Sequence, residues 1–265
     1  MTAATMARQG AVAVVTGASR GLGQGIAVAL AETGFDVVVG FHRDADGAKA
    51  TVGAVEACGQ RAVAVGGDVA DAATADILLA VALADLGGLT AWVNNAGVSV
   101  LGPVLDTTAA ELARMVDVNL LGTFHGVKAA ARAFLDLGTG GRIVNIASEV
   151  GLQAFRYLGG YAATKFAVVG LTQAAALELS PAGITVNAVC PGTAETDMVL
   201  AERSSEIAYT GLDAESIRAS YLDAIPAGRF CAPEDVGAMV AWLAGPGAAY
   251  VTGQSLCVNG GSVLR

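Results

Sequence analysis

Residues 12–23 read VAVVTGASRGLG, and this stretch decides the fold of the chain. Its apolar start, Val12–Thr16, predicts a buried β-strand, and the segment near 22–33 predicts a helix. Glycines between the two allow a tight turn, so that backbone amides and the helix dipole face an anion together. Glycine is common here, with 35 residues, so the order of strand, loop and helix gives the pattern its weight. We therefore predict a loop that binds a dinucleotide pyrophosphate through Gly17, Ser19, Arg20, Gly21, Leu22 and Gly23.

Short apolar runs and longer helix-periodic segments alternate along the rest of the chain. Further strands are predicted at Asp36–Phe41, Ala62–Gly66, Thr90–Asn94, Arg142–Ala147, Thr185–Cys190 and Ser255–Val258. Further helices are predicted near 45–58, 72–86, 108–136, 158–180 and 233–244. Strands that are apolar throughout are buried on both faces, and this order of elements implies parallel pairing. The sequence predicts an α/β fold, a doubly wound Rossmann-type parallel sheet of about seven strands with helices on both faces, in a single domain over 1–265.

The stretch 194–230 departs from this alternation. It is polar and loop-like, and it lies between the sixth predicted strand and the last predicted helix. A long excursion inside a compact domain usually serves binding. We expect a substrate lid here, and a surface insertion without a role in binding is the alternative.

Composition and charge exclude several classes of function. The net charge of −9 disfavours nucleic acid and anionic membrane as partners, because both attract basic surfaces. No apolar run reaches the roughly 18 residues of a membrane span, and the first ten residues lack the apolar core of a signal peptide. Two histidines and four scattered cysteines predict neither a metal site nor a disulfide framework. We expect a cytoplasmic protein without a metal.

The end of the second strand predicts the choice of dinucleotide. Proteins that bind NAD usually place an acid there for the ribose hydroxyl, whereas this chain has Phe41. Arg43, with His42, and Arg20 could instead hold the 2′-phosphate of NADP. NADP is therefore the predicted cofactor. NAD is possible if Asp44 reaches back to the ribose.

A tyrosine and a lysine one helical turn apart are the strongest chemical signal. Tyr161 and Lys165 share a helix face, and the chain has only five tyrosines. An ordinary tyrosine is a poor acid or base at neutral pH, but a nearby ammonium would lower its pKa. Such a phenol can give a proton to a carbonyl oxygen or take one from an alcohol. Ser148 ends the fifth strand at the edge where ligands bind, so its hydroxyl can orient the same oxygen. A helix or turn cap is the alternative for Ser148.

Together these residues resemble the classical short-chain dehydrogenase/reductase family over nearly the whole chain. The matching motifs are TGASRGLG at 16–23, DV at 68–69, NNAG at 94–97, Asn119, Ser148, Tyr161 with Lys165, PG at 191–192, GR at 228–229, PEDV at 233–236, VTGQ at 251–254 and NGG at 259–261. The resemblance implies that Tyr161 is the catalytic acid/base and that Lys165 holds the nicotinamide ribose. It further implies that Ser148 orients the carbonyl and that Asn119 holds a water for proton transfer. Implied cofactor contacts are Asp68, Val69, Asn95, Ala96, Gly97, Tyr161, Lys165, Pro191, Gly192, Ala194 and Thr196.

The resemblance also implies an activity and an assembly. We expect an NADP(H)-dependent oxidoreductase that interconverts a small ketone and a secondary alcohol, in a homotetramer paired through the helices near 108–136 and 158–180. The alternatives are an NAD-dependent polyol or acetoin-type dehydrogenase, a 3-oxoacyl-carrier-protein reductase, and a non-catalytic dinucleotide-sensing regulator. Glu149 follows Ser148, so we expect its carboxylate either to contact the substrate or to lie solvated at the rim of the pocket.

Overall fold

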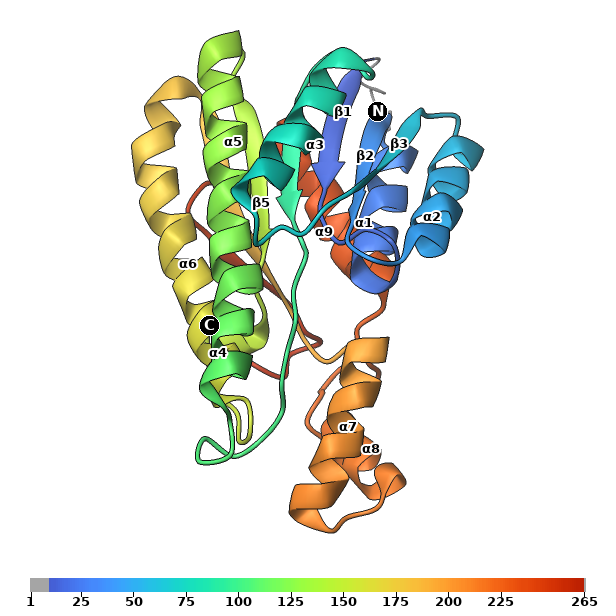
Figure 1. Cartoon of the computed structure of the whole chain (residues 1–265), viewed down its shortest axis with the longest axis vertical. Helices are drawn as coiled ribbons and strands as arrows, with labels where there is room; N and C mark the ends of the chain where they lie inside the picture. The colour runs from blue at the N-terminus through green and yellow to red at the C-terminus, as the bar shows by residue number, and fades with distance from the viewer. Residues whose placement is uncertain (1–9, 265) are drawn as a thin grey trace.

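A seven-stranded parallel sheet forms the centre of the computed structural model, which describes residues 10–264 (Figure 1). The strands are β1 (Ala11–Val15), β2 (Phe35–Phe41), β3 (Ala62–Gly66), β4 (Ala91–Asn94), β5 (Gly141–Ile146), β6 (Ile184–Pro191) and β7 (Ser255–Val258). Their order in the sheet is β3-β2-β1-β4-β5-β6-β7, and each neighbouring pair is parallel. The strands β2 and β3 lie on one side of β1, and β4 to β7 lie on the other, so the order of the strands switches between β1 and β4. Ligands bind at such a switch point in open α/β sheets. The predicted doubly wound fold is confirmed.

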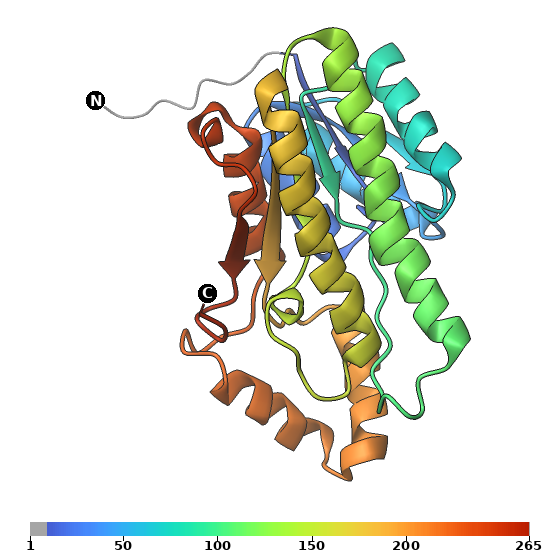
Figure 2. The same ribbon diagram turned by 90° about the vertical axis from the view of Figure 1, so that its left-hand side faces the viewer.

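Helices cover both faces of the sheet. On one face lie α1 (Gly21–Glu32), α2 (Ala45–Ala57) and α9 (Pro233–Ala244), and on the other lie α3 (Ala72–Ala84), α5 (Gly122–Leu137) and α6 (Gly159–Leu179). Short helical segments are α4 (Ala109–Met115), η1 (Val116–Leu121), η2 (Glu149–Gly151), η3 (Ser180–Ala182) and η4 (Pro246–Ala248). The helices α7 (Asp197–Thr210) and α8 (Ala214–Asp223) lie beyond the carboxyl ends of the strands (Figure 2).

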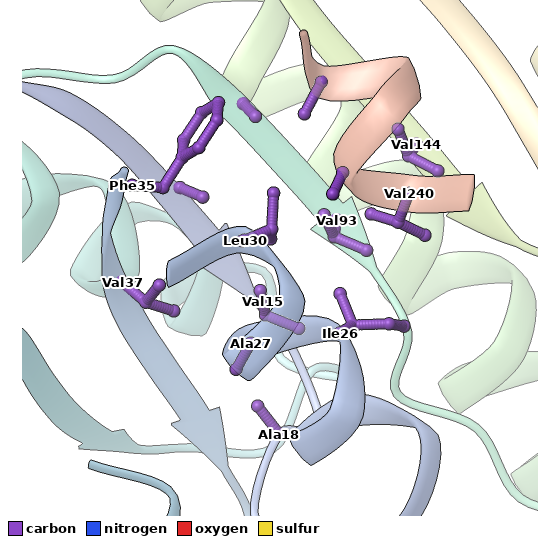
Figure 3. Close-up of a cluster of buried hydrophobic side chains, with 14 of the residues drawn as sticks. Val15, Ala18, Ile26, Ala27, Leu30, Phe35, Val37, Val93, Val144 and Val240 are labelled. Atoms are coloured by element: carbon purple, nitrogen blue, oxygen red, sulfur yellow. The ribbon is translucent and has the colours of Figure 1, made fainter. Parts of the chain in front are cut away.

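Alternation along β1 explains why its sequence is apolar throughout. Ala13 and Val15 face the core cluster under α1 and α9, whereas Val12 and Val14 face the cluster under α3 and α5. Figure 3 shows the first cluster, in which Ile26, Ala27 and Leu30 of α1 lie against the strands. A strand buried on both faces needs apolar residues at every position, so it reads as a continuous run.

Small residues bring α1 and α9 into close contact. A Cβ added to Gly25 would lie 2.5 Å from the Cβ of Pro233, and one added to Gly237 would lie 2.7 Å from the carbonyl oxygen of Gly25. Because atoms cannot approach so closely, larger residues at either glycine would push the helices apart. This contact fixes α1, and with it the loop that precedes it.

A chain of hydrogen bonds between buried polar side chains runs from β4 through β5 to α6. Trp92 Nε1 donates to Asn94 Oδ1 at 2.7 Å, and Asn94 Nδ2 donates to Asn145 Oδ1 at 2.9 Å. Asn145 Nδ2 then donates to the hydroxyl of Thr172 on α6 at 2.9 Å. Buried polar groups are costly unless each finds a partner. These bonds therefore set how α6 lies against β4 and β5.

The structure corrects the sequence interpretation in two places. The stretch 194–230 was expected to be loop-like, but it contains α7 and α8. These helices bury few side chains, Ile217 among them, so their apolar periodicity is weak. The helix expected near 108–136 is helical throughout, but its middle, the π-helical η1 that contains Asn119, separates the α-helical α4 and α5.

Within residues 10–264, no helix combines the length and apolarity needed to cross a membrane. Nor does any group of three potential metal ligands converge in that same part of the chain.

Candidate active site

A cavity of about 1240 Å³ opens at the carboxyl ends of the strands. Its walls come from the loop after β1, the ends of β2, β4, β5 and β6, and the lid helices α7 and α8. In Figure 2 these two helices lie below the strand ends, across from the sheet. The cavity therefore occupies the switch point, and α7 and α8, from the segment predicted to be a lid, line its far side.

The loop after β1 is held by hydrogen bonds to the loop after β4. The Thr16 hydroxyl accepts from the amides of Asn95 and Ala96, at 3.0 and 3.1 Å. Asn95 Nδ2 in turn donates to the carbonyl oxygens of Thr16 and Gly17, at 2.9 and 3.0 Å. A Cβ on Gly23 would lie only 2.2 Å from the Gly17 oxygen, so this close approach requires glycine. These contacts fix the loop after β1 against the loop after β4.

The N-terminus of α1 fits an anion. Among residues 10–264, no side chain caps this helix, and no acid stands in its first turn. By contrast, α2, α3 and α8 begin at aspartates whose side chains accept an amide hydrogen bond. Amides at the end of α1 therefore face the cavity together with the positive end of the helix dipole. A dinucleotide pyrophosphate would offer acceptors to these amides.

The end of β2 contributes basic side chains to the same cavity. His42, Arg43 and Asp44 all line it, and Asp44 also caps α2, its Oδ1 accepting from the Gly47 amide at 2.9 Å. One carboxylate oxygen of Asp44 is thus engaged by the helix, and the alternative in which Asp44 holds a ribose stays open. Further along, Asp68 accepts from Arg114 at 3.0 Å. Burial opposes ionisation of Asp68, but the Ala70 amide and Arg114 hold its pKa below the ordinary value.

Tyr161 and Lys165 project from α6 into the centre of the cavity. Lys165 Nζ donates to the Ile146 carbonyl oxygen at 2.8 Å and lies 5.6 Å from the centre of the Tyr161 ring. Burial lowers the pKa of Lys165 to about 8. Burial, and then the charge of Glu202, raise the pKa of Tyr161, while the neighbouring Ser148 hydroxyl lowers it. The pKa of the Tyr161 phenol is therefore raised, whereas the sequence predicted that Lys165 would lower it, because loss of water dominates.

The contacts of Ser148 fit both roles predicted for it, the cap of a turn and the group that orients the substrate oxygen. Its Oγ accepts from the Val150 amide at 3.1 Å and so caps η2, as the alternative proposed. Ser148 also lines the cavity, and its hydroxyl lowers the pKa of the neighbouring Tyr161 phenol. The cap fixes the side chain at the position where a substrate oxygen would meet both hydroxyls.

Asn119 lies behind the cavity wall. Its Nδ2 donates to the Val98 carbonyl at 2.9 Å and to the Thr164 hydroxyl at 3.0 Å, and its Oδ1 accepts from the Val98 amide at 2.8 Å. The side chain is fully buried and ties the loop after β4 to α6. A Cβ on Gly97 would lie 3.5 Å from Asn119 Oδ1 and 3.6 Å from Lys165 Nζ, so both side chains converge there. A water held by this residue stays a prediction.

The loop after β6 closes the site near α1. Pro191, Gly192, Ala194 and Thr196 all line the cavity, and a Cβ on Gly21 would lie 3.5 Å from the Thr196 side chain. The sequence motifs of β1 and β6 thus meet in space. Apart from Asn119, every residue predicted to bind cofactor or substrate lines this one cavity.

Ion pairs and cation–π contacts hold α7 and α8 in place. Glu195 accepts from Arg203 of α7 at 3.2 Å and from Arg218 of α8 at 2.9 Å. Both guanidinium groups lie over the Phe230 ring, 5.3 and 5.1 Å from its centre. Two other nitrogens of Arg203, Nε and Nη2, are buried without a partner in the described part of the chain. These contacts join both lid helices to the loop after β6.

Glu149 lines the cavity, as one of its two expected positions required, and its contact with a substrate stays a prediction. It is buried, its carboxylate accepts from the Ser262 hydroxyl, and it accepts from Asn259 Nδ2 at 3.3 Å. Burial raises its pKa. Glu149 therefore fastens the chain after β7 to the start of η2, and it is not a solvated rim charge.

Comparison with known proteins identifies the architecture. A family profile described as "short chain dehydrogenase" matches residues 11–207. The chain belongs to the short-chain dehydrogenase family. The L-2,3-butanediol dehydrogenase of Corynebacterium glutamicum is 42% identical over 258 residues, which cover 96% of this chain and 99% of that enzyme. The 3beta-hydroxysteroid dehydrogenase 1 of Eggerthella lenta is 40% identical over 256 residues, covering 97% and 95%. A short-chain type dehydrogenase/reductase from Mycobacterium marinum has a crystal structure that matches with a TM-score of 0.87, at 33% identity and 97% coverage of both chains.

As a short-chain dehydrogenase, the chain is an oxidoreductase that uses NAD or NADP. Several residues at its site escaped the sequence interpretation. Thr16 holds the dinucleotide loop, Arg114 pairs with Asp68, and Glu202 and Glu206 face the cavity from α7. The spacing of Val199, Glu202 and Glu206 by three and four residues is a helical signal within 194–230, and it places these side chains on one face.

Proposed function

We propose that this short-chain dehydrogenase is an NADP(H)-dependent ketoreductase and secondary-alcohol dehydrogenase in which Tyr161 is the acid/base. The observation that carries the proposal is the meeting of Tyr161, Lys165 and Ser148 in the same cavity as an uncapped helix N-terminus. A bound nicotinamide dinucleotide would supply or accept the hydride. The chain itself has to hold the substrate oxygen and move one proton.

Ser148, Tyr161 and Lys165 have separate roles in holding the substrate oxygen and moving the proton. In ketone reduction, Ser148 donates a hydrogen bond to the carbonyl oxygen, and Tyr161 gives it the proton as the alcohol forms. Because burial raises the pKa of Tyr161, the phenol keeps its proton at neutral pH, which is the form that reduction needs. Alcohol oxidation needs the phenolate, so its rate should rise with pH. Lys165, with its pKa lowered to about 8, is the adjacent group that can stabilise the phenolate.

Turnover tests the proposed function directly. The purified protein should consume NADPH with small ketones and reduce NADP with secondary alcohols. Absence of turnover with every ketone and alcohol of a broad panel, with either dinucleotide, would contradict an enzymatic function and favour a dinucleotide-sensing regulator.

Preference for NADP over NAD is proposed to come from Arg43, together with Arg20 and His42. We expect Arg43→Ala to raise the KM for NADPH by roughly 10- to 100-fold, as expected for loss of a charge-assisted contact. The KM for NADH should change little, because NADH has no 2′-phosphate. Lys49→Ala is the matched control, since Lys49 is an exposed cation paired with Asp46 on α2 and lies outside the cavity. Equal effects of Arg43→Ala on both cofactors would contradict this assignment.

The oligomeric state is proposed to be a homotetramer that pairs α5 and α6 between subunits. These helices lie side by side on the outer face of the molecule (Figures 1 and 2). Phe124, Phe166 and Leu177 are exposed on them, at 45%, 45% and 82%, and large apolar side chains on one face favour an interface. Light scattering after gel filtration should give four times the mass of one chain. Phe166→Glu should lower that mass, and a monomeric wild type would contradict the proposal.

The role of the segment 194–230 and the location of the enzyme are proposals as well. We propose that the segment 194–230 is a lid that closes over the bound substrate. We also propose a cytoplasmic location, because the four unpaired cysteines suit a reducing compartment.

A further inference from the structure

A strained tyrosine lies in the loop between η2 and α6, just before the catalytic helix. Phe155 to Leu158 form a β-turn, in which the Leu158 amide donates to the Phe155 carbonyl oxygen at 3.4 Å. Tyr157 is the third residue of this turn, and its φ of +66° is the only positive φ outside glycine in the range 10–264. A turn with a positive φ at its third residue favours glycine there, because a side chain is strained in that conformation. Contacts outside the turn must therefore hold Tyr157 in place.

Two other segments of the chain supply these contacts. The Tyr157 carbonyl oxygen accepts from the amide of Gly102, in the loop after β4, at 2.8 Å. The Tyr157 ring stacks on the ring of Tyr209, the penultimate residue of α7, with 5.9 Å between the ring centres and 27° between the planes. A Cβ on Gly102 would lie 3.3 Å from the Tyr209 hydroxyl, so Tyr209 contacts both loops. The loop after β4, the loop before α6 and the end of α7 thus meet at this pair of rings.

The pair of rings joins the end of the lid helix to the wall of the active site. Tyr157 lines the cavity four residues before Tyr161, whereas Tyr209 lies outside the cavity. Near its other end, α7 is joined to the loop after β6 by the ion pair of Arg203 with Glu195. Arg203 precedes Tyr209 by six residues, so the two attachments lie at different places along the helix. The end of α7 can therefore move away from the cavity wall only when the two rings separate.

We propose that stacking of Tyr209 on Tyr157 holds α7 over the bound substrate, so that the two tyrosines are positioning residues that set substrate affinity. This inference rests on the proposed ketoreductase function and on the proposed lid. Strain at Tyr157 weakens the closed arrangement, because the turn can relax once the rings separate. The closed lid therefore reopens for product release. Proton transfer by Tyr161 does not require the stack.

Substitution of Tyr209 tests the stack without changing the cavity lining. Tyr209→Ala should raise the KM for a small ketone by roughly 3- to 10-fold, as expected for loss of an aromatic pair, with kcat within about two-fold of wild type. Tyr209→Phe keeps the ring and should retain the wild-type KM. Tyr250→Ala removes a fully exposed tyrosine outside the cavity and is the matched control.

Two substitutions of Tyr157 separate loss of the stack from loss of stability. Both Tyr157→Ala and Tyr157→Gly remove the ring, but only glycine also relieves the strain of the positive φ. Tyr157→Gly should therefore melt at a higher temperature than Tyr157→Ala, while both variants raise the ketone KM equally. Adding Tyr209→Ala to Tyr157→Ala should raise the KM no further, because the stack is already lost. A KM that follows melting temperature among these variants would show a merely structural role and overturn the proposal.

Trypsin cleavage reports on the lid without any turnover. Cleavage after Arg203 of α7 and Arg218 of α8, identified by mass spectrometry, should be roughly 3- to 10-fold faster in Tyr209→Ala than in wild type, because an open lid is the cleavable form. Tyr209→Phe should be cleaved at the wild-type rate.

Failure of the proposed function and failure of this inference give different results. Faster cleavage of Tyr209→Ala, in a protein whose wild type turns over no ketone, would overturn the ketoreductase function and still support the stack as the contact that holds the lid. Ketone turnover with an unchanged KM in a folded Tyr209→Ala would overturn this inference alone. An unchanged cleavage rate in that variant would also overturn it.

Discussion

Tyr161→Phe should lower kcat for ketone reduction by about 10²- to 10⁴-fold, the usual contribution of a positioned general acid. Phenylalanine keeps the ring that lies 5.6 Å from Lys165 Nζ but removes the only hydroxyl that this residue offers to the substrate oxygen. Ser148 remains and can still orient the carbonyl, but the developing alkoxide must then take its proton from water. The measurement is the rate of NADPH consumption at saturating ketone.

Two controls make the result specific to the phenol. Tyr250→Phe is the same chemical change at a fully exposed residue outside the cavity, and its kcat should match wild type. NADPH affinity of Tyr161→Phe, measured by calorimetry, should stay within a few-fold of wild type, because the ring and Lys165 remain. A Tyr161→Phe protein that keeps more than about a tenth of wild-type kcat would contradict the acid/base role.

Gly23→Ala should weaken NADPH binding by roughly 10- to 100-fold, corresponding to about 1–3 kcal/mol for an overpacked site. The added Cβ would lie 2.2 Å from the Gly17 carbonyl oxygen and 2.5 Å from Asn95 Nδ2. These two atoms are hydrogen-bonded to each other at 3.0 Å, so the methyl group must push the bond apart. Displacement of the Gly17 loop moves the amides that face the pyrophosphate.

The matched control is Gly53→Ala on α2, where an added Cβ has no neighbour within 4 Å. Alanine there should leave NADPH affinity unchanged and should stabilise the helix slightly, by up to about 1 kcal/mol. Calorimetric titration with NADPH and thermal melting of both variants provide the comparison. Unchanged affinity in Gly23→Ala would show that the loop does not hold the dinucleotide.

Local patterns were sufficient for most of the fold. Each predicted strand lies within a residue or two of an observed strand, because strands buried on both faces are apolar at every position. The lid was harder, since α7 and α8 are held by Glu195, Arg203, Arg218 and Phe230 instead of an apolar stripe. Such helices have little periodicity for a sequence interpretation to find.

Individual side-chain partners were the least predictable part of the site. The sequence placed Asn119 and Glu149 near the chemistry, but their partners are Val98 and Thr164 for the first, and Asn259 and Ser262 for the second. The Glu149 contacts join residues more than a hundred positions apart. No spacing rule along the chain encodes such a contact.

The sequence by itself determined the alternating α/β order, the glycine loop at 16–23 and the pairing of Tyr161 with Lys165 on one helix face. These features depend on neighbours within one strand, turn or helix, so local periodicity and backbone sterics are enough to predict them. Only the tertiary structure decided that Glu202 lines the same cavity as Tyr161 and that burial and the charge of Glu202 raise the pKa of the phenol. Those properties depend on how α6 and α7 enclose the cavity and remove water from it, and both charge interaction and desolvation are set by distance in space instead of distance along the chain.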